Sequence, residues 1–225
     1  MLPAEEIQPT APISGTVVWL HGLGADGHDF VPVAPLLCRP DLRFVFPHAP
    51  RRRVTINGGY LMRAWYDIRS MERGSDREDP ADIAASHADL VAQLDREVAR
   101  GVPPERIVLA GFSQGAAMAL HTGLRYPRRL AGLVALSGYL VLEHQLDAEA
   151  HAANAATPLF IGHGDRDDVV PVEAGHATFA RLRASRPADY HGYAMGHEVN
   201  TQEIVDLGQW LARWLPAPDA ETRRG

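Results

Sequence analysis

Short apolar runs recur along this chain, and a glycine or another turn-forming residue follows most of them. They lie at residues 16–20, 43–46, 106–110, 130–136, 158–161 and roughly 189–193. Apolar runs of this length, rich in β-branched residues, predict β-strands. Several are apolar on both alternating faces, which is typical of parallel strands that helices cover on both sides.

Helical periodicity appears between those runs. Residues 80–100 carry the clearest apolar stripe, formed by Ile83, Leu90, Val91, Leu94 and Val98. Weaker stripes at 114–125, 173–185 and 202–215 predict three more helices. Strands that alternate with helices predict an α/β fold with one doubly wound, mostly parallel sheet and helices on both faces. Ligands of such sheets bind beyond the carboxyl ends of the strands.

A chain of 225 residues favours one domain, 1–225, over two. Proline-rich composition predicts irregular ends at about 1–12 and 216–225. Residues 51–79 fit neither period and are rich in glycine, arginine and charge. We expect this segment to be a loop that covers the site, or alternatively a pair of short elements.

Composition excludes some classes of partner. The formal net charge is −6 and the basic residues are spread along the chain, so no nucleic-acid partner is expected. Neither a membrane-spanning apolar run nor a signal-peptide pattern is present, so we expect a cytoplasmic protein without stable membrane insertion. The single cysteine, Cys38, fits a reducing compartment, and its neighbours favour packing at a helix end over a nucleophilic role.

The most specific motif is Gly111-Phe112-Ser113-Gln114-Gly115, which follows an apolar run and precedes a helical segment. In a GxSxG elbow the small residues let strand and helix approach each other, and the serine hydroxyl projects from a strained turn above the sheet. Ser113 is therefore the candidate nucleophile. The alternative is a glycine-rich helix start that Ser113 merely caps.

A serine nucleophile needs an imidazole base and a carboxylate that orients it, and in this fold they follow the serine in the order acid, then histidine. Asp165, Asp167 and Asp168 share the loop after the run at 158–161, and spacing alone does not choose among them. His197 follows the last predicted strand and is the candidate base. The acidic loop lacks the pattern of a calcium loop, and no zinc-type histidine pair occurs, so no metal is expected.

The tetrahedral intermediate of acyl transfer needs two backbone N–H donors. The first is expected from Gln114, directly after the nucleophile. The second is expected from the glycine-rich segment 21–27 after the first strong strand, with Leu23 as the choice. A phosphate-binding loop is the alternative, but the segment lacks lysine, Walker spacing and GxGxxG.

Taken together, these motifs resemble the phospholipase/carboxylesterase family of α/β-hydrolases, over nearly the whole chain from Val18 to about Leu215. The pieces that carry the resemblance are LHGLGADG at 20–27, RAWYDI at 63–68, LAGFSQG at 109–115, LSGY at 136–139, the acidic loop and GHE at 196–198. The family's HGxxDxVVP pattern implies Asp167 as the acid, with Asp168 where many relatives have proline. The resemblance also implies the α/β-hydrolase fold, Leu23 and Gln114 as oxyanion donors, Trp65 beside the acyl pocket, and a homodimer.

The expected function is a serine carboxylesterase that acts on short- to medium-chain esters through Ser113, His197 and Asp167, without a cofactor. The alternative with the same machinery is an acyl-protein thioesterase or lysophospholipase. Peptide or lactone hydrolysis, and a non-catalytic ligand-binding protein on the same fold, are the rival hypotheses.

Overall fold

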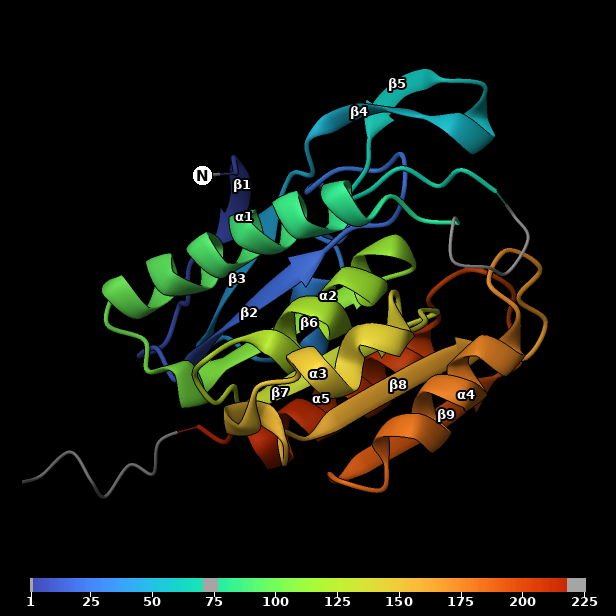
Figure 1. Ribbon diagram of the computed structural model, residues 1–225. Coiled ribbons are helices and arrows are strands. Elements are labelled where there is room, and N and C mark those ends of the chain that lie inside the picture. The colour runs from blue at the N-terminus through green and yellow to red at the C-terminus, as the bar shows by residue number, and fades with distance from the viewer. Residues whose placement is uncertain (1, 71–76, 218–225) are drawn as a thin grey trace, which may run out of the picture.

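The protein is built around a seven-stranded sheet, with a separate two-stranded ribbon at one end (Figure 1). The computed structural model describes residues 2–70 and 77–217. The strands of the large sheet are β1 (Ala4–Ile7), β2 (Gly15–Leu20), β3 (Leu42–Pro47), β6 (Ile107–Phe112), β7 (Gly132–Leu136), β8 (Leu159–Gly164) and β9 (Ala188–Tyr193). β4 (Arg51–Val54) and β5 (Tyr60–Arg63) form the ribbon.

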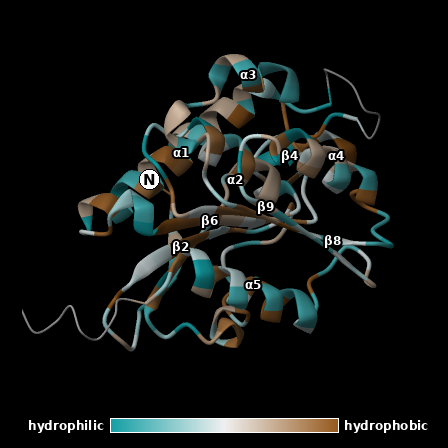
Figure 2. Ribbon diagram, turned by 90° about the horizontal axis from the view of Figure 1, so that it is seen from below, coloured by the Kyte–Doolittle hydropathy of each residue, from teal (hydrophilic) through white to brown (hydrophobic). Residues whose placement is uncertain are grey.

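The helices alternate with those strands. The α-helices are α1 (Pro80–Ala99), α2 (Gln114–Arg125), α3 (Leu146–Glu149), α4 (Val172–Leu182) and α5 (Thr201–Trp214). Short 3₁₀ helices lie at Ala34–Leu37, Thr55–Asn57, Pro104–Arg106, Glu143–Gln145 and Ala152–Asn154. In Figure 2, α1, α2, α3 and α4 lie on one face of the sheet and α5 lies on the other.

The strand order is β1-β3-β2-β6-β7-β8-β9, and every neighbouring pair except β1 with β3 is parallel. The chain moves outward in one direction from β2 to β3 and in the other from β6 onward. The order therefore reverses between β2 and β6, and the crevice beyond their carboxyl ends is where such sheets bind ligands.

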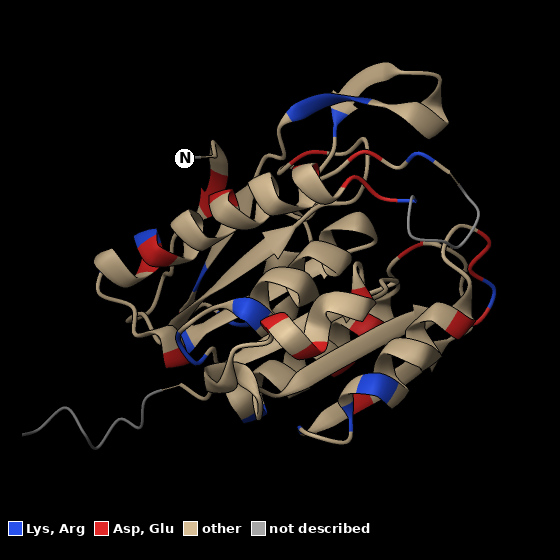
Figure 3. Cartoon of the chain, viewed as in Figure 1, with Lys and Arg blue, Asp and Glu red and all other residues tan. Residues whose placement is uncertain are grey.

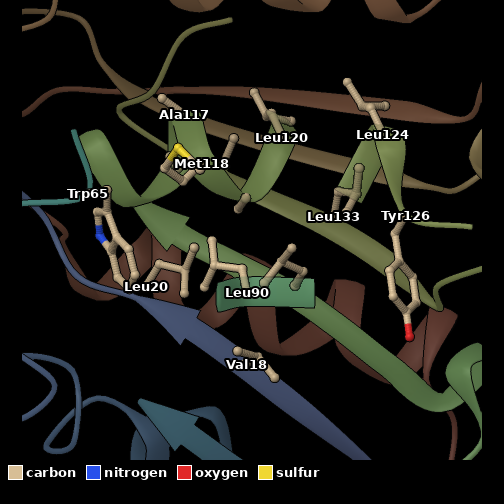
Figure 4. Packing of buried hydrophobic residues seen from close by; sticks show 14 of the residues in the cluster. Val18, Leu20, Trp65, Leu90, Ala117, Met118, Leu120, Leu124, Tyr126 and Leu133 are labelled. Atoms are coloured by element: carbon tan, nitrogen blue, oxygen red, sulfur yellow. The ribbon is translucent and has the colours of Figure 1, made fainter. Parts of the chain in front are cut away.

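Burial explains why these segments form their elements. Residues of β2, β7 and β8 are buried on both faces, because helices cover the sheet from both sides. The helix α1 begins at a strong signal: the Asp79 side chain accepts hydrogen bonds from the N–H groups of Ala81 and Asp82, and Pro80 fills the first position. Figure 4 shows the core between α2 and the sheet, where Leu20, Trp65 and Met118 pack together.

The predicted fold class is confirmed, and each predicted strand and long helix corresponds to an observed element within three residues at either end. Two predictions need correction. The N-terminal end is not irregular throughout, because β1 adds an antiparallel edge to β3 through backbone bonds that its own side-chain pattern does not signal. Cys38 ends the 3₁₀ helix at Ala34–Leu37, as expected, but its side chain is exposed rather than packed.

Residues 51–79 contain the ribbon, so the alternative of two short elements is correct for 51–63. Part of the predicted covering loop, 71–76, and most of the predicted irregular C-terminal end, 218–225, lie outside the described residues. That the whole chain forms one domain stays a prediction.

Candidate active site

The turn between β6 and α2 carries Ser113 in a backbone conformation that side-chain-bearing residues rarely adopt, with φ 55° and ψ −120°. Two glycines make the turn possible. A Cβ on Gly111 would lie 2.3 Å from the carbonyl of Gly115, and a Cβ on Gly115 would lie 2.4 Å from the carbonyl oxygen of Leu20. The Ser113 side chain makes no capping hydrogen bond to α2. This geometry disfavours the alternative in which Ser113 merely caps the helix.

Three side chains from separate strand ends meet at this turn. His197 lies between the other two: its Nε2 is 2.8 Å from Ser113 Oγ, and its Nδ1 is 2.7 Å from Asp167 Oδ2. Because a carboxylate only accepts, Nδ1 carries the proton toward Asp167, and Nε2 is left to accept from the serine hydroxyl. Asp165 and Asp168 are exposed, and of the three acids on this loop Asp167 is the one in contact with His197.

The Asp167 carboxylate is fully buried, and both of its oxygens accept hydrogen bonds. Its Oδ1 accepts the backbone N–H groups of Val169 and Val170 at 2.9 and 2.8 Å. Burial by itself raises the pKa of Asp167, but the hydrogen bonds from His197, Val170 and Val169 outweigh it and hold this pKa below its ordinary value. The acid is therefore charged at neutral pH and accepts the hydrogen bond of the His197 Nδ1–H group.

The two expected oxyanion donors are the N–H groups of Leu23 and Gln114. The Leu23 N–H makes no backbone hydrogen bond among the described residues, and the Gln114 N–H lies in the first turn of α2, where N–H groups have no partner within the helix. Gln114 is the first residue of α2 and follows the serine directly. The loop that contains Leu23 lies against the serine, because a Cβ on Gly22 would be 3.5 Å from Ser113 Cβ. Two N–H groups from the segments next to the nucleophile are what an oxyanion site requires.

His21, which the sequence did not single out, is buried directly after β2. Its Nδ1 is 2.7 Å from the Gly22 carbonyl oxygen, and its Nε2 is 3.0 Å from the Ala49 N–H. Burial, the largest cause, lowers the pKa of His21 to about 4. The imidazole is therefore neutral at pH 7, donating from Nδ1 and accepting at Nε2. The signal that could have indicated a role is its place at the start of the glycine-rich segment 21–27, directly after a buried strand.

Trp65 is fully buried in the core, with its ring centroid 5.3 Å from that of His21. Its indole N–H donates to the carbonyl oxygen of His21 at 2.8 Å. The Gln114 side chain, also buried, accepts from the backbone N–H of Trp65 and donates to the Tyr66 carbonyl, both at 2.8 Å. This placement favours packing for Trp65, and contact with substrate stays a prediction.

A cavity of about 760 Å³ lies beyond the carboxyl ends of β7 and β8, next to the loop that carries Asp167. Its lining mixes apolar and charged side chains: Arg77, Glu78, Tyr139, Leu140, Leu142, Glu143, His144, Asp147, Val170, Pro171, Ala174, Ala177, Thr178 and Arg181. Tyr139 is among these lining residues, and its hydroxyl is 2.8 Å from that of Tyr66. The cavity is large enough for a small organic group.

Glu5, His28 and His48 form the one group in the described ranges with ligand atoms close enough to hold a metal. Both histidine Nε2 atoms lie 3.2 Å from Glu5 Oε1. However, the Gly27 N–H donates to His48 Nδ1 at 3.0 Å, so Nε2 carries the proton of a neutral His48. A metal bound at Nε2 would move the proton to Nδ1 and so break the hydrogen bond from the Gly27 N–H. The arrangement therefore fits a hydrogen-bonded cluster better than a metal site.

Acidic and basic residues are interspersed over the helices and loops in Figure 3. Across residues 2–70 and 77–217, no helix has the length and apolar character needed to cross a membrane.

Comparison with known proteins gives one consistent family. The phospholipase/carboxylesterase family model matches residues 3–215. Acyl-protein thioesterase 1 from Saccharomyces cerevisiae is 34% identical over 222 residues, which cover 94% of this chain and 96% of that protein. A probable carboxylesterase from Oryza sativa subsp. japonica is 34% identical over 224 residues, covering 96% and 84%.

Solved structures agree with these matches. Zea mays acyl-protein thioesterase 2 has a TM-score of 0.83 at 28% identity, covering 96% of this chain and 100% of that one. Esterase PE8 has a TM-score of 0.83 at 32% identity, covering 95% and 99%.

Proposed function

The chain belongs to the phospholipase/carboxylesterase family and is an esterase or thioesterase hydrolase, and we propose that it cleaves short- to medium-chain carboxylic esters with Ser113, His197 and Asp167 as catalytic residues. The observation that carries this proposal is the position of His197, whose two ring nitrogens lie within hydrogen-bond distance of Ser113 Oγ and Asp167 Oδ2. The matched relatives are named as esterases and thioesterases, which supports the reaction class.

The geometry supports a two-step acyl transfer. Ser113 Oγ attacks the acyl carbon while His197 Nε2 takes the hydroxyl proton. The carbonyl oxygen becomes an oxyanion and accepts hydrogen bonds from the N–H groups of Leu23 and Gln114. The C–O bond to the leaving group then breaks, and the alcohol departs with the proton from His197. Water, deprotonated by His197, attacks the acyl-Ser113 ester, and the carboxylic acid leaves with Ser113 regenerated.

The charged Asp167 supports this sequence because it stabilises the imidazolium that forms at each step. No step requires a metal or an organic cofactor. The cavity of about 760 Å³ is lined by Val170 and Pro171 of the Asp167 loop but by neither Ser113 nor His197, so the preference for short- to medium-chain acyl groups stays a prediction.

Thioester hydrolysis is the second candidate, favoured by the acyl-protein thioesterases among the matched relatives. The same serine, base and oxyanion donors serve both reactions, because both pass through a tetrahedral intermediate on Ser113. That this chain acts on the same substrate as the Saccharomyces cerevisiae protein is therefore only a proposal. A cytoplasmic location and a homodimer also stay predictions.

The test is hydrolysis of a chromogenic ester series of increasing acyl length and of a long-chain acyl thioester, by the parent and by Ser113→Ala. We expect kcat/KM of the variant to fall by roughly 10⁴-fold or more. Ser137→Ala is the matched control, since Ser137 is another serine at positive φ after a strand, and its Oγ has no partner among the described residues. Activity that survives in Ser113→Ala, or is absent from the parent, would overturn the proposal.

A further inference from the structure

The oxyanion site proposed above depends on where one peptide unit points. The Leu23 N–H belongs to the same peptide as the Gly22 carbonyl, and in a trans peptide the two groups point in opposite directions. His21 Nδ1 donates to that carbonyl at 2.7 Å, and the Ala25 N–H approaches it at 3.4 Å. Holding the carbonyl on one side aims the N–H to the other.

The preceding peptide is held as well. The carbonyl of His21 accepts the indole N–H of Trp65 at 2.8 Å. Two successive peptides, those that end at Gly22 and at Leu23, are thus fixed by buried side chains rather than by a strand or helix.

The Gln114 side chain connects this arrangement to the nucleophile. It accepts from the Trp65 N–H and donates to the Tyr66 carbonyl, so it fixes the backbone from which the indole projects. Gln114 itself directly follows Ser113 and supplies the other expected oxyanion donor. The connection therefore runs from the serine turn through Gln114 to Trp65, and from Trp65 to His21 and the Leu23 peptide.

We propose that the Gln114 side chain and the Trp65 indole are positioning residues that hold the Leu23 N–H in register with Ser113. This rests on the proposed function and extends it. The Gln114 backbone N–H serves as an oxyanion donor, and its side-chain amide holds the backbone of Trp65 and Tyr66. Neither side chain needs to touch substrate. Together they fix the distance between two donors that arise 91 residues apart in the sequence.

Two substitutions remove these bonds and leave the main chain in place. Trp65→Phe removes the indole donor and keeps an aromatic ring, and Gln114→Met removes both amide bonds at similar volume. We expect kcat on a short chromogenic ester to fall by about 10- to 100-fold with KM within about twofold, because small misplacement of a donor weakens only the transition state. We also expect an alkylboronic acid, which forms a tetrahedral adduct on serine, to bind more weakly by a similar factor.

The chain offers a matched control for each variant. Trp19 is a fully buried tryptophan whose Nε1 has no partner among the described residues, and Gln93 is a fully buried glutamine whose amide atoms likewise have none there. Trp19→Phe and Gln93→Met are expected to keep the parent kcat. In the double variant of Trp65 and Gln114 the loss should be no greater than in the more severe single variant, because both act through one segment.

Deuterium exchange at the backbone amides of 21–25 gives a readout that does not depend on catalysis. Faster exchange in Trp65→Phe than in Trp19→Phe supports the proposal even if the parent hydrolyses no ester, in which case only the proposed function fails. Parent-like exchange and parent-like kcat in Trp65→Phe, with only a lower melting temperature, would overturn it. Trp65→Phe decides the question if Gln114→Met does not fold.

Discussion

The serine turn and the tip of the β4–β5 ribbon each contain two glycines, for opposite physical reasons. At the turn, a Cβ on Gly111 or Gly115 would lie 2.3 to 2.4 Å from backbone atoms. At the ribbon tip, Gly58 and Gly59 have φ 66° and 75°, and nothing lies within 4 Å of a Cβ on either. Gly111 and Gly115 are required because there is no space for a side chain, whereas Gly58 and Gly59 are required because their φ is positive. Only the glycines of the serine turn therefore pack closely against other parts of the molecule.

The largest expected effect comes from filling the space at the turn. Gly115→Ala places a methyl group against the backbone of β2, which has no flexible atoms to move aside, so we expect the free energy of unfolding to fall by about 3 kcal/mol or more. Urea unfolding measures this loss, and ester hydrolysis reports the accompanying loss of activity. A Gly115→Ala variant that is as stable as Gly58→Ala would break the comparison.

The stability of the region around the serine turn should depend on pH through His21, while the ribbon contains no histidine and should not contribute. The pKa of His21 is about 4 in the folded protein, against 6.5 ordinarily. Between these values the unfolded chain binds a proton that the folded chain does not, so stability falls as pH falls from about 6.5 to 4. The loss approaches about 3 kcal/mol at pH 4, at about 1.4 kcal/mol per pKa unit.

Urea unfolding of the parent and of His21→Gln across that window checks the sign and isolates His21 from other groups, since the variant should lose this part of the slope. An imidazole of His21 that titrates near 6.5 by NMR would contradict the expectation.

Substitutions at the ribbon tip should cost less. Gly58→Ala puts a Cβ on a residue at positive φ, which costs about 1 kcal/mol, while Gly58→Asn should cost only a few tenths because asparagine tolerates this region. Thermal unfolding of the pair separates the two effects. Equal losses in both variants would mean that space, and not backbone angle, limits the tip.

The smallest effect on stability is expected from the exposed side chains of the ribbon. Tyr60 and Leu61 are 75% and 56% exposed, so Tyr60→Ser and Leu61→Ser should each change the free energy of unfolding by no more than about 0.5 kcal/mol. The ribbon nevertheless joins the loop that contains Leu23, since the Gly24 N–H donates to the Arg63 carbonyl at 2.9 Å.

If the ribbon covers the site, KM for a long-chain ester should rise by about fivefold in Leu61→Ser, the loss of roughly 1 kcal/mol of apolar contact. KM for an acetyl ester is the internal control and should not change. Equal KM values for the long-chain ester in parent and variant would remove the ribbon from substrate binding.

The same contrast explains what the sequence predicted. Strands buried on both faces and helices with an apolar stripe can be recognised from the pattern of apolar residues in their sequence. The serine turn can be recognised from its motif, because both of its glycines are needed for close packing. The sheet, the long helices, and the approach of His197 and of one acid from the 165–168 loop to Ser113 followed from these signals. β1 and the ribbon did not, because Ala4–Ile7 and Arg51–Val54 are held by backbone pairing and have no apolar alternation.

The parts of the site that sequence reasoning missed are contacts between distant segments. The neutral state of His21 arises from burial, and the two bonds of the Gln114 amide reach backbone groups 49 and 48 residues away, so neither feature has a local signature. Asp167 was chosen over its neighbours by family resemblance, and the turn that buries it and exposes Asp165 and Asp168 arises from its own bonds to Val169 and Val170.

The backbone of Ser113 has a consequence for how this chain evolves. A residue at φ 55° and ψ −120° costs of order 1–3 kcal/mol, and glycine relieves that cost because it has no Cβ. Selection for a stable fold alone would therefore drive position 113 toward glycine, and a lineage released from hydrolysis would drift in that direction. The proposed role of the hydroxyl gives a reason for serine at this position despite that cost.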